Sequence, residues 1–165
     1  MKNKKVLFMA QAAMIAAIYV VLTFVANAFG LASGSIQVRL SEALTVLPYF
    51  TPAAIPGLFI GCLFSNILTG CCLLDIIMGS IATLIGAVGT YALRKIKWTA
   101  PLPPIIANIL IVPFVLINGY GIPSPYGLLM LTVGIGEVIS CGILGMGLLL
   151  VLDKNKEAIF HNINA

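Results

Sequence analysis

Charged side chains are scarce in this chain of 165 residues. Asp, Glu, Lys and Arg make up 8% of it and hydrophobic residues 61%, whereas soluble domains contain about 25% and roughly 45–50%. A soluble core cannot hold this excess of apolar side chains, so the composition excludes a soluble globular protein. It predicts an integral protein of the cell membrane, and the length predicts that residues 1–165 form a single transmembrane domain.

The sequence also lacks the motifs of several catalytic classes. It has no Gly-x-x-x-x-Gly-Lys-Ser/Thr loop, so the chain does not itself bind ATP as a P-loop protein. It has neither a Gly-x-Ser-x-Gly elbow nor a His-Glu-x-x-His pair. The single histidine, His161, lies in the C-terminal tail, and the four cysteines show no metal-ligand spacing. We therefore expect no enzyme activity, no metal site and buried, small hydrophobic roles for the cysteines.

Long apolar runs predict an all-α fold of six transmembrane helices. The first run could be a signal peptide, but residues 6–24 are longer than a signal-peptide core, so a first membrane helix is the better interpretation. The second segment starts at Ser41, a candidate N-cap, and holds only roughly ten residues before prolines interrupt it, too few to span alone. The expected helices are 6–27, 41 to about 48–52, 53–68, 75–93, 105–117 and 126–152.

The chain would cross the membrane five times if residues 41–68 formed a single kinked helix, and six times if they form two helices. The positions of the basic residues decide between these alternatives. With six crossings, eight of the nine basic residues lie on one side. The positive-inside rule makes that side, with both termini, cytoplasmic. The eight are Lys2, Lys4, Lys5, Arg94, Lys95, Lys97, Lys154 and Lys156, and the ninth, Arg39, falls on the outer side.

The six-helix topology gathers polar residues at the outer end. We expect a pocket there, open to the outside, walled by helices 75–93, 105–117 and 126–152, and suited to a small organic ligand. Glu137 lies about 15 Å below the outer end of the last helix and has no basic residue nearby in sequence, so we favour a ligand contact for it. The candidate ligand-binding residues are Arg39, Glu42, Asn66, Asp75, Asn118, Tyr120 and Glu137.

Structural roles remain open for most of these residues. Asp75 could act only as an N-cap, and Arg39 and Glu42, three residues apart, could only pair with each other. Tyr120 could stack on a flat ligand or belong to the aromatic belt. Three asparagines could satisfy one another across helices: Asn66, Asn108 and Asn118.

The first helix carries a stripe of small residues. Two overlapping small-xxx-small pairs, Ala12/Ala16 and Ala13/Ala17, would let another helix approach closely in lipid. The other helix could belong to a partner protein or to the same bundle. Gly57 and Gly61, in the expected helix 53–68, are also small residues four apart, and they too could face either a partner protein or the same bundle.

Several blocks of this sequence resemble the QueT family. They are residues 37–48 and 51–58, Asn66 with residues 68–70, residues 74–76 and 79–84, and residues 134–137. The alanine stripe is similar to the Ala-x-x-x-Ala motif of a broader class, the substrate-binding S components of energy-coupling factor (ECF) transporters. The resemblance implies a six-helix subunit that captures a queuosine precursor, a 7-deazaguanine, outside the cell. It would dock on a membrane scaffold protein and two ATPases, which use the ATP, so the chain itself needs no cofactor.

The chemistry of the candidate residues agrees with such a ligand. A carboxylate accepts hydrogen bonds from both the ring N–H and the exocyclic amine of a guanine-like edge, with Glu137 the first choice and Asp75 the second. Asn118 could donate to the ring carbonyl while Tyr120 stacks on the base. The competing hypothesis is a stand-alone secondary transporter in which Glu137 and Asp75 carry protons. The resemblance assigns no role to Cys71 and Cys72.

Overall fold

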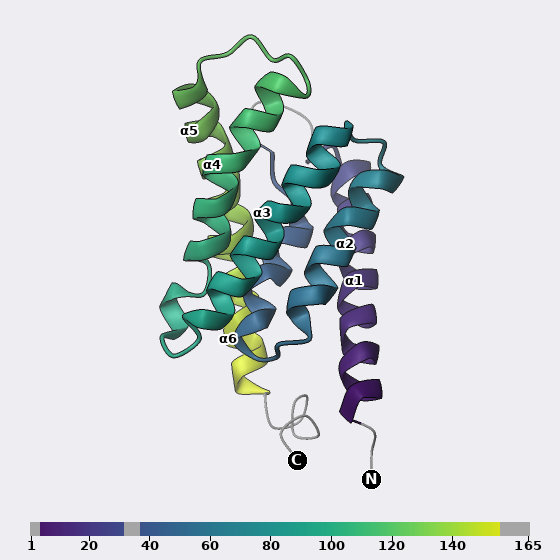
Figure 1. Ribbon diagram of the computed structural model, residues 1–165. Coiled ribbons are helices and arrows are strands. Elements are labelled where there is room, and N and C mark those ends of the chain that lie inside the picture. The colour runs from purple at the N-terminus through teal and green to yellow at the C-terminus, as the bar shows by residue number, and fades with distance from the viewer. Residues whose placement is uncertain (1–3, 32–36, 156–165) are drawn as a thin grey trace.

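The computed structural model describes residues 4–31 and 37–155, and every regular element in these ranges is helical, which confirms the all-α prediction. The helices run side by side along one long axis (Figure 1). In chain order they are α1 (Lys4–Ala28), η1 (Leu40–Tyr49), α2 (Ala54–Leu68), α3 (Leu73–Ala92), η2 (Lys97–Thr99), α4 (Leu102–Asn118), α5 (Tyr126–Glu137), η3 (Val138–Gly145) and α6 (Met146–Lys154).

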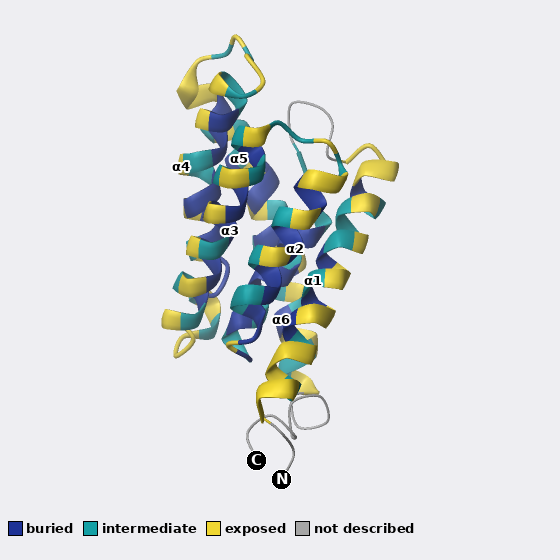
Figure 2. Cartoon of the chain, turned by 45° about the vertical axis from the view of Figure 1, so that its right-hand side comes forward, coloured by how far each residue is buried: buried dark blue, intermediate teal, exposed yellow. Residues whose placement is uncertain are grey.

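Four helical stretches of the described chain are long and apolar enough to cross a membrane: Lys4–Ala28, Leu73–Ala92, Lys97–Asn118 and Tyr126–Lys154. The apolar helix α2 is shorter, at 15 residues. Exposed positions lie on the outward faces of the helices and buried ones on the faces turned toward one another (Figure 2). Many of the exposed side chains are large and apolar, as expected of a surface in contact with lipid. The protein is a multi-pass membrane protein.

The short second segment, η1, is a 3-10 helix inside the bundle. Its ten residues rise about 2.0 Å each, so it extends about 20 Å, more than an α-helix of equal length. It packs against α1, α3 and η3, and most of its side chains are buried, so it need not face lipid along its length. Ser41 is not its N-cap; the segment begins after Arg39, and the Ser41 hydroxyl instead bonds the Thr23 hydroxyl at 3.0 Å.

The last segment is a continuous helix whose middle, η3, is a π-helix of eight residues between α5 and α6. A π-helical turn is wider than an α-helical one and often occurs at functional sites. Here Ser140 and Cys141 are buried and lie on the side that packs against η1. Gly145 lets η1 approach, since a Cβ there would lie 3.0 Å from Val46.

The start of α1, the end of α6 and the connection from α3 to α4 lie at one end of the bundle (Figure 1). An ion pair between Lys97 Nζ and Asp153 Oδ2, at 2.9 Å, ties that connection to α6. We call this the basic end, because all the described basic residues except Arg39 belong to these segments. The arrangement is the one that six crossings require, and its sidedness in the membrane stays a prediction.

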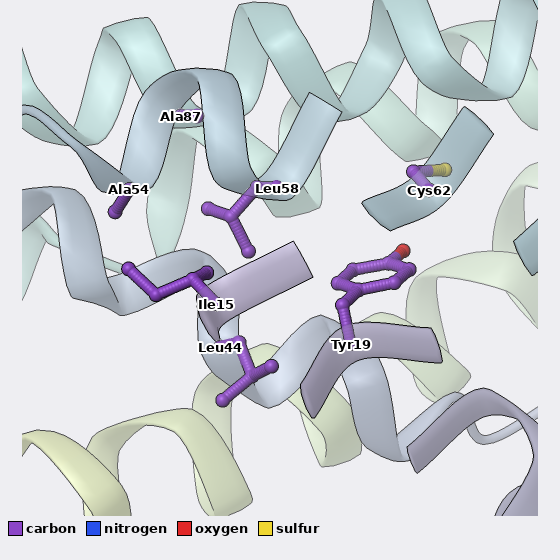
Figure 3. Packing of buried hydrophobic residues seen from close by; sticks show 7 residues of the cluster. All are labelled: Ile15, Tyr19, Leu44, Ala54, Leu58, Cys62 and Ala87. Atoms are coloured by element: carbon purple, nitrogen blue, oxygen red, sulfur yellow. The ribbon is translucent and has the colours of Figure 1, made fainter. Parts of the chain in front are cut away.

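The alanine stripe of α1 is divided between two faces. A Cβ on Gly57 would lie 2.7 Å from the Ala12 carbonyl oxygen, and one on Gly61 would lie 3.1 Å from Ala16 Cα. Ala12 and Ala16 therefore pack inside the bundle against α2. Ile15 and Tyr19, which also face Gly57 and Gly61, belong to the core cluster shown in Figure 3. Ala13 and Ala17 are exposed. Of the two alternatives, packing within the bundle therefore holds for Ala12 and Ala16, and a contact with a partner protein stays a prediction for Ala13 and Ala17.

Candidate functional site

A cavity of about 310 Å³ lies at the end of the bundle opposite the basic end. Helices α1, α2 and α4 wall it, together with the start of α3 and the segment leading into η1. The prediction placed the pocket between helices 75–93, 105–117 and 126–152, and the structure places it closer to α1 and α2. Its polar lining residues are Tyr19, Thr23, Asn27, Gln37, Arg39, Ser41, Ser65, Asn66, Thr69, Cys71, Asp75 and Tyr120.

Asp75 is the central acid of this cavity. Its Oδ2 accepts a hydrogen bond from the Tyr120 hydroxyl at 2.8 Å and lies 3.9 Å from Arg39 Nη2. Its Oδ1 is buried and has no hydrogen-bond partner in the described chain. Arg39 therefore faces Asp75, and it does not form the isolated pair with Glu42 that its spacing allowed.

Asp75 lies in the first turn of α3. The helix begins after Cys72 without a side-chain cap, so Asp75 does not act as an N-cap. Partial burial, and then the hydrogen bond to Asp75, raise the pKa of Tyr120 above its ordinary value, so its hydroxyl stays a donor. Tyr120 thus holds Asp75 by its hydroxyl while its ring remains on the cavity wall.

The asparagines do not satisfy one another as one alternative proposed. Asn66 lines the cavity and donates from Nδ2 to the Asp75 carbonyl oxygen at 3.3 Å, which joins α2 to α3. Asn118 is exposed, donates to the Phe114 carbonyl oxygen at 2.8 Å and does not line the cavity. Asn108 is buried deeper in the bundle.

Glu42 lies next to the cavity without lining it. The Tyr19 hydroxyl donates to Glu42 Oε1 at 2.6 Å, and Tyr19 itself lines the cavity. Glu42 is 1% exposed, and its Oε2 has no hydrogen-bond partner in the described chain. Tyr19 was not among the site residues predicted from the sequence. The available signal was a polar hydroxyl near the middle of an otherwise apolar helix, one turn after Ala16.

Glu137 lies beside Glu42 and is 7% exposed. The Cys141 thiol donates to Glu137 Oε2 at 3.3 Å and also contacts the Glu42 carbonyl oxygen at 3.4 Å. One carboxylate oxygen of each glutamate and Cys141 Sγ all lie within 4.8 Å of one another, a grouping that the sequence spacing did not predict. These are the residues of the described chain that could hold a metal ion, with two hard ligands and one soft one.

The backbone before η1 is fixed against the last helix. The Arg39 N–H donates to the Ser140 hydroxyl at 3.1 Å. Gly136 lets the Gln37 carbonyl oxygen touch α5, because a Cβ at that position would overlap this oxygen. A second cavity of about 360 Å³, lined mainly by α5 and the connection from α4 to α5, shares Gln37, Leu116 and Ile122 with the first. The segment that carries Arg39 is thus positioned by η3 and α5.

A family model described as QueT transporter matches residues 9–154 of this chain. The chain belongs to the QueT transporter family. A curated relative named Queuosine precursor transporter QueT, from Lactococcus lactis subsp. cremoris (strain MG1363), is 35% identical over 85 residues. The match covers 52% of this chain and about half, 50%, of the relative. No solved structure matches the chain.

The QueT family and this relative are transporters, which confirms the expectation of a protein that is not an enzyme. Three of the blocks that resemble the QueT family contribute residues to the lining of the first cavity. Residues 37–48 form η1 and the segment before it, and Asn66 and Asp75 come from two further blocks.

Proposed function

We propose that this protein is the substrate-binding S component of an ATP-driven ECF-type importer. It captures a queuosine precursor, a 7-deazaguanine, outside the cell and passes it through an energy-coupling module made of a membrane scaffold and two ATPases. The observation that carries the proposal is the cavity with Arg39, Asp75 and Tyr120 on its wall, at the end of the bundle opposite the basic end. A volume of about 310 Å³ is within the range of small-molecule sites.

Asp75 is positioned to recognise the base. Arg39 and Tyr120 hold its Oδ2, while its Oδ1 has no partner in the described residues. A guanine-like edge offers two adjacent N–H donors, which a carboxylate accepts together. The Tyr120 ring, on the same wall, is available for stacking on the base. A ligand without these donors would leave the buried Oδ1 unsatisfied, which gives specificity.

Glu137 and Glu42 supply negative charge beneath this wall. Glu137 does not line the cavity, so Glu137→Gln is expected to weaken binding of a 7-deazaguanine only through the rearrangement of a buried charge beside the site, by about 1–3 kcal/mol. Titration calorimetry on the purified variant measures this change. Unchanged affinity would make Glu137 a structural residue and leave Asp75 as the main acid of the site.

The exposed alanines of α1 provide a surface for the scaffold. Ala13 and Ala17 face outward, and small residues permit close helix contact in lipid. Ala13→Trp or Ala17→Trp should abolish copurification with the scaffold and ATP-dependent uptake, while ligand binding survives. Ala12→Trp and Ala16→Trp are the matched variants, because these positions pack against Gly57 and Gly61 and should lose the fold itself. Retained copurification in both outward variants would contradict this docking surface.

The buried pair of glutamates supports a second candidate function, a stand-alone proton-coupled transporter. Uptake by proteoliposomes separates the two hypotheses. The ECF-type hypothesis predicts transport of a labelled 7-deazaguanine only when the scaffold and both ATPases are present with ATP. Uptake by this chain alone, driven by a pH gradient, would establish the secondary transporter instead.

A further inference from the structure

Glu42, Glu137 and Cys141 form a buried cluster outside the two cavities described above. They are 1%, 7% and 0% exposed, and none of them lines either cavity. One ligand atom from each residue lies within 4.8 Å of the other two. Among the described residues, Arg39 is the basic one outside the basic end, and its guanidinium lies against Asp75. The cluster thus gathers acidic groups without a cation of its own in the described chain.

The spacing of two of these residues along the last helix suits metal binding. Glu137 and Cys141 are four residues apart, and the Cys141 thiol reaches Glu137 Oε2 at 3.3 Å, so both lie on one face. Helical zinc motifs place two ligands at this spacing. A π-helical segment begins directly after Glu137, and such turns often occur at functional sites. Glu42 completes the cluster from η1, which packs against η3.

One oxygen of Glu42 shows that the cluster lacks a partner. Glu42 Oε1 accepts a hydrogen bond from the Tyr19 hydroxyl at 2.6 Å, whereas Oε2 is buried and has no hydrogen-bond partner in the described chain. A buried carboxylate oxygen rarely stays without a donor or a metal ion. Because this carboxylate already lies beside Glu137 and Cys141, a cation held among the three residues would satisfy it.

The sulfur of Cys141 has more acceptors around it than one thiol proton can serve. It lies 3.3 Å from Glu137 Oε2, 3.4 Å from the Glu42 carbonyl oxygen and 3.4 Å from Thr45 Oγ1. The Thr45 hydroxyl donates its own proton to the Glu42 carbonyl oxygen at 2.6 Å, so it does not donate to the sulfur. A metal ion bound to the sulfur would replace the thiol proton and neutralise the neighbouring carboxylates.

We propose that Glu42, Glu137 and Cys141 bind a zinc ion. Zn²⁺ takes carboxylate oxygen and thiolate sulfur in one tetrahedral set, whereas Ca²⁺ and Mg²⁺ prefer oxygen ligands. The Asn108 amide of α4 faces both glutamates, and its oxygen is the candidate fourth ligand. On binding, the Cys141 thiol proton passes to water and the sulfur binds as a thiolate. Zinc bonds of about 2.0–2.3 Å place ligand atoms roughly 3.3–3.8 Å apart, so the three groups need to close by at most about 1.5 Å.

The metal ion would act as a structural link beside the ligand cavity. Tyr19 joins Glu42 to the cavity wall, and the Arg39 N–H donates to the hydroxyl of Ser140, next to Cys141. Because zinc binding is coupled to folding, the ion would hold η1 against the last helix and raise the stability of the protein. This inference goes beyond the proposed function, since none of it needs a queuosine precursor.

Metal loading followed by elemental analysis tests the site. The purified full-length protein is stripped with a chelator, incubated with Zn²⁺ alone and freed of excess metal by gel filtration. It should retain about one zinc ion per chain. Glu137→Gln and Cys141→Ala should each bind zinc at least about tenfold more weakly in competition with a chelating dye. The matched control is Cys71→Ala/Cys72→Ala, which removes the two half-exposed thiols and should keep the zinc.

Cobalt substitution tests for the thiolate in the unaltered protein, so it decides the matter even if a variant fails to fold. Bound Co²⁺ should show a near-ultraviolet sulfur-to-cobalt charge-transfer band, which the Cys71→Ala/Cys72→Ala control should keep and Cys141→Ala should lose. Zn²⁺ should also raise the midpoint of detergent unfolding of the unaltered protein and not that of Cys141→Ala. Folded protein that retains no zinc would overturn the proposal. So would bound cobalt without the charge-transfer band, or zinc bound equally well by Glu137→Gln and Cys141→Ala.

Discussion

Removing the Tyr19 hydroxyl tests how the site is held together. Tyr19 is 2% exposed, and its hydroxyl donates to Glu42 Oε1 at 2.6 Å. Tyr19→Phe keeps the ring in the core cluster but leaves Glu42 without this donor, while its Oε2 already lacks one. Hydrogen bonds to charged groups contribute about 1.5–3 kcal/mol, so we expect the free energy of unfolding to fall by that amount.

The measurement is reversible unfolding of the purified protein in mild detergent as denaturing detergent is added. Tyr126→Phe is the matched control, because its hydroxyl donates to the Leu110 carbonyl oxygen at an exposed position. A substitution of that kind should change stability by no more than about 0.5 kcal/mol. Equal losses in the two variants, or no loss in Tyr19→Phe, would refute the account of Glu42 as a buried acceptor held by Tyr19.

Two further predictions follow from the packing and the topology. Gly136→Ala should destabilise the protein by about 1–3 kcal/mol and weaken ligand binding, because the new methyl group pushes on the Gln37 carbonyl oxygen. Gly147→Ala, where a Cβ meets nothing within 4 Å, should be neutral or stabilising in the same detergent unfolding assay. An impermeant thiol reagent applied outside the cell should label Ser124→Cys and not Lys95→Cys in a variant without the four native cysteines. The reverse labelling would overturn the assignment of the basic end to the cytoplasm.

Local sequence signals predicted the helix positions well. The third predicted helix, 53–68, is α2 at Ala54–Leu68, and the fourth, 75–93, is α3 at Leu73–Ala92. Apolar length, together with glycine and proline in the connections, is sufficient for this because these signals act within a few residues. The same signals gave the length of the last segment but not its π-helical middle, which depends on packing against η1.

The contacts of the site could not be predicted in the same way. Arg39 pairs with Asp75, 36 positions away, although Glu42 was the acid at helical spacing. Tyr19 reaches Glu42 across 23 positions. Such pairings depend on how each helix is rotated about its axis, which apolar helices with weak amphipathicity leave undetermined. For the same reason the sequence did not show which alanines of α1 face inward.

Equilibrium binding to the isolated, purified protein tests the central claim most directly. We predict that it binds a 7-deazaguanine queuosine precursor and discriminates against vitamins and guanine. Asp75→Asn should weaken this binding by about 10- to 100-fold, because a charged acceptor on the cavity wall is lost, without a large fall in thermal stability. Folded, monodisperse protein that binds no 7-deazaguanine, but binds another nutrient with unchanged affinity in Asp75→Asn, would contradict both the ligand and the site.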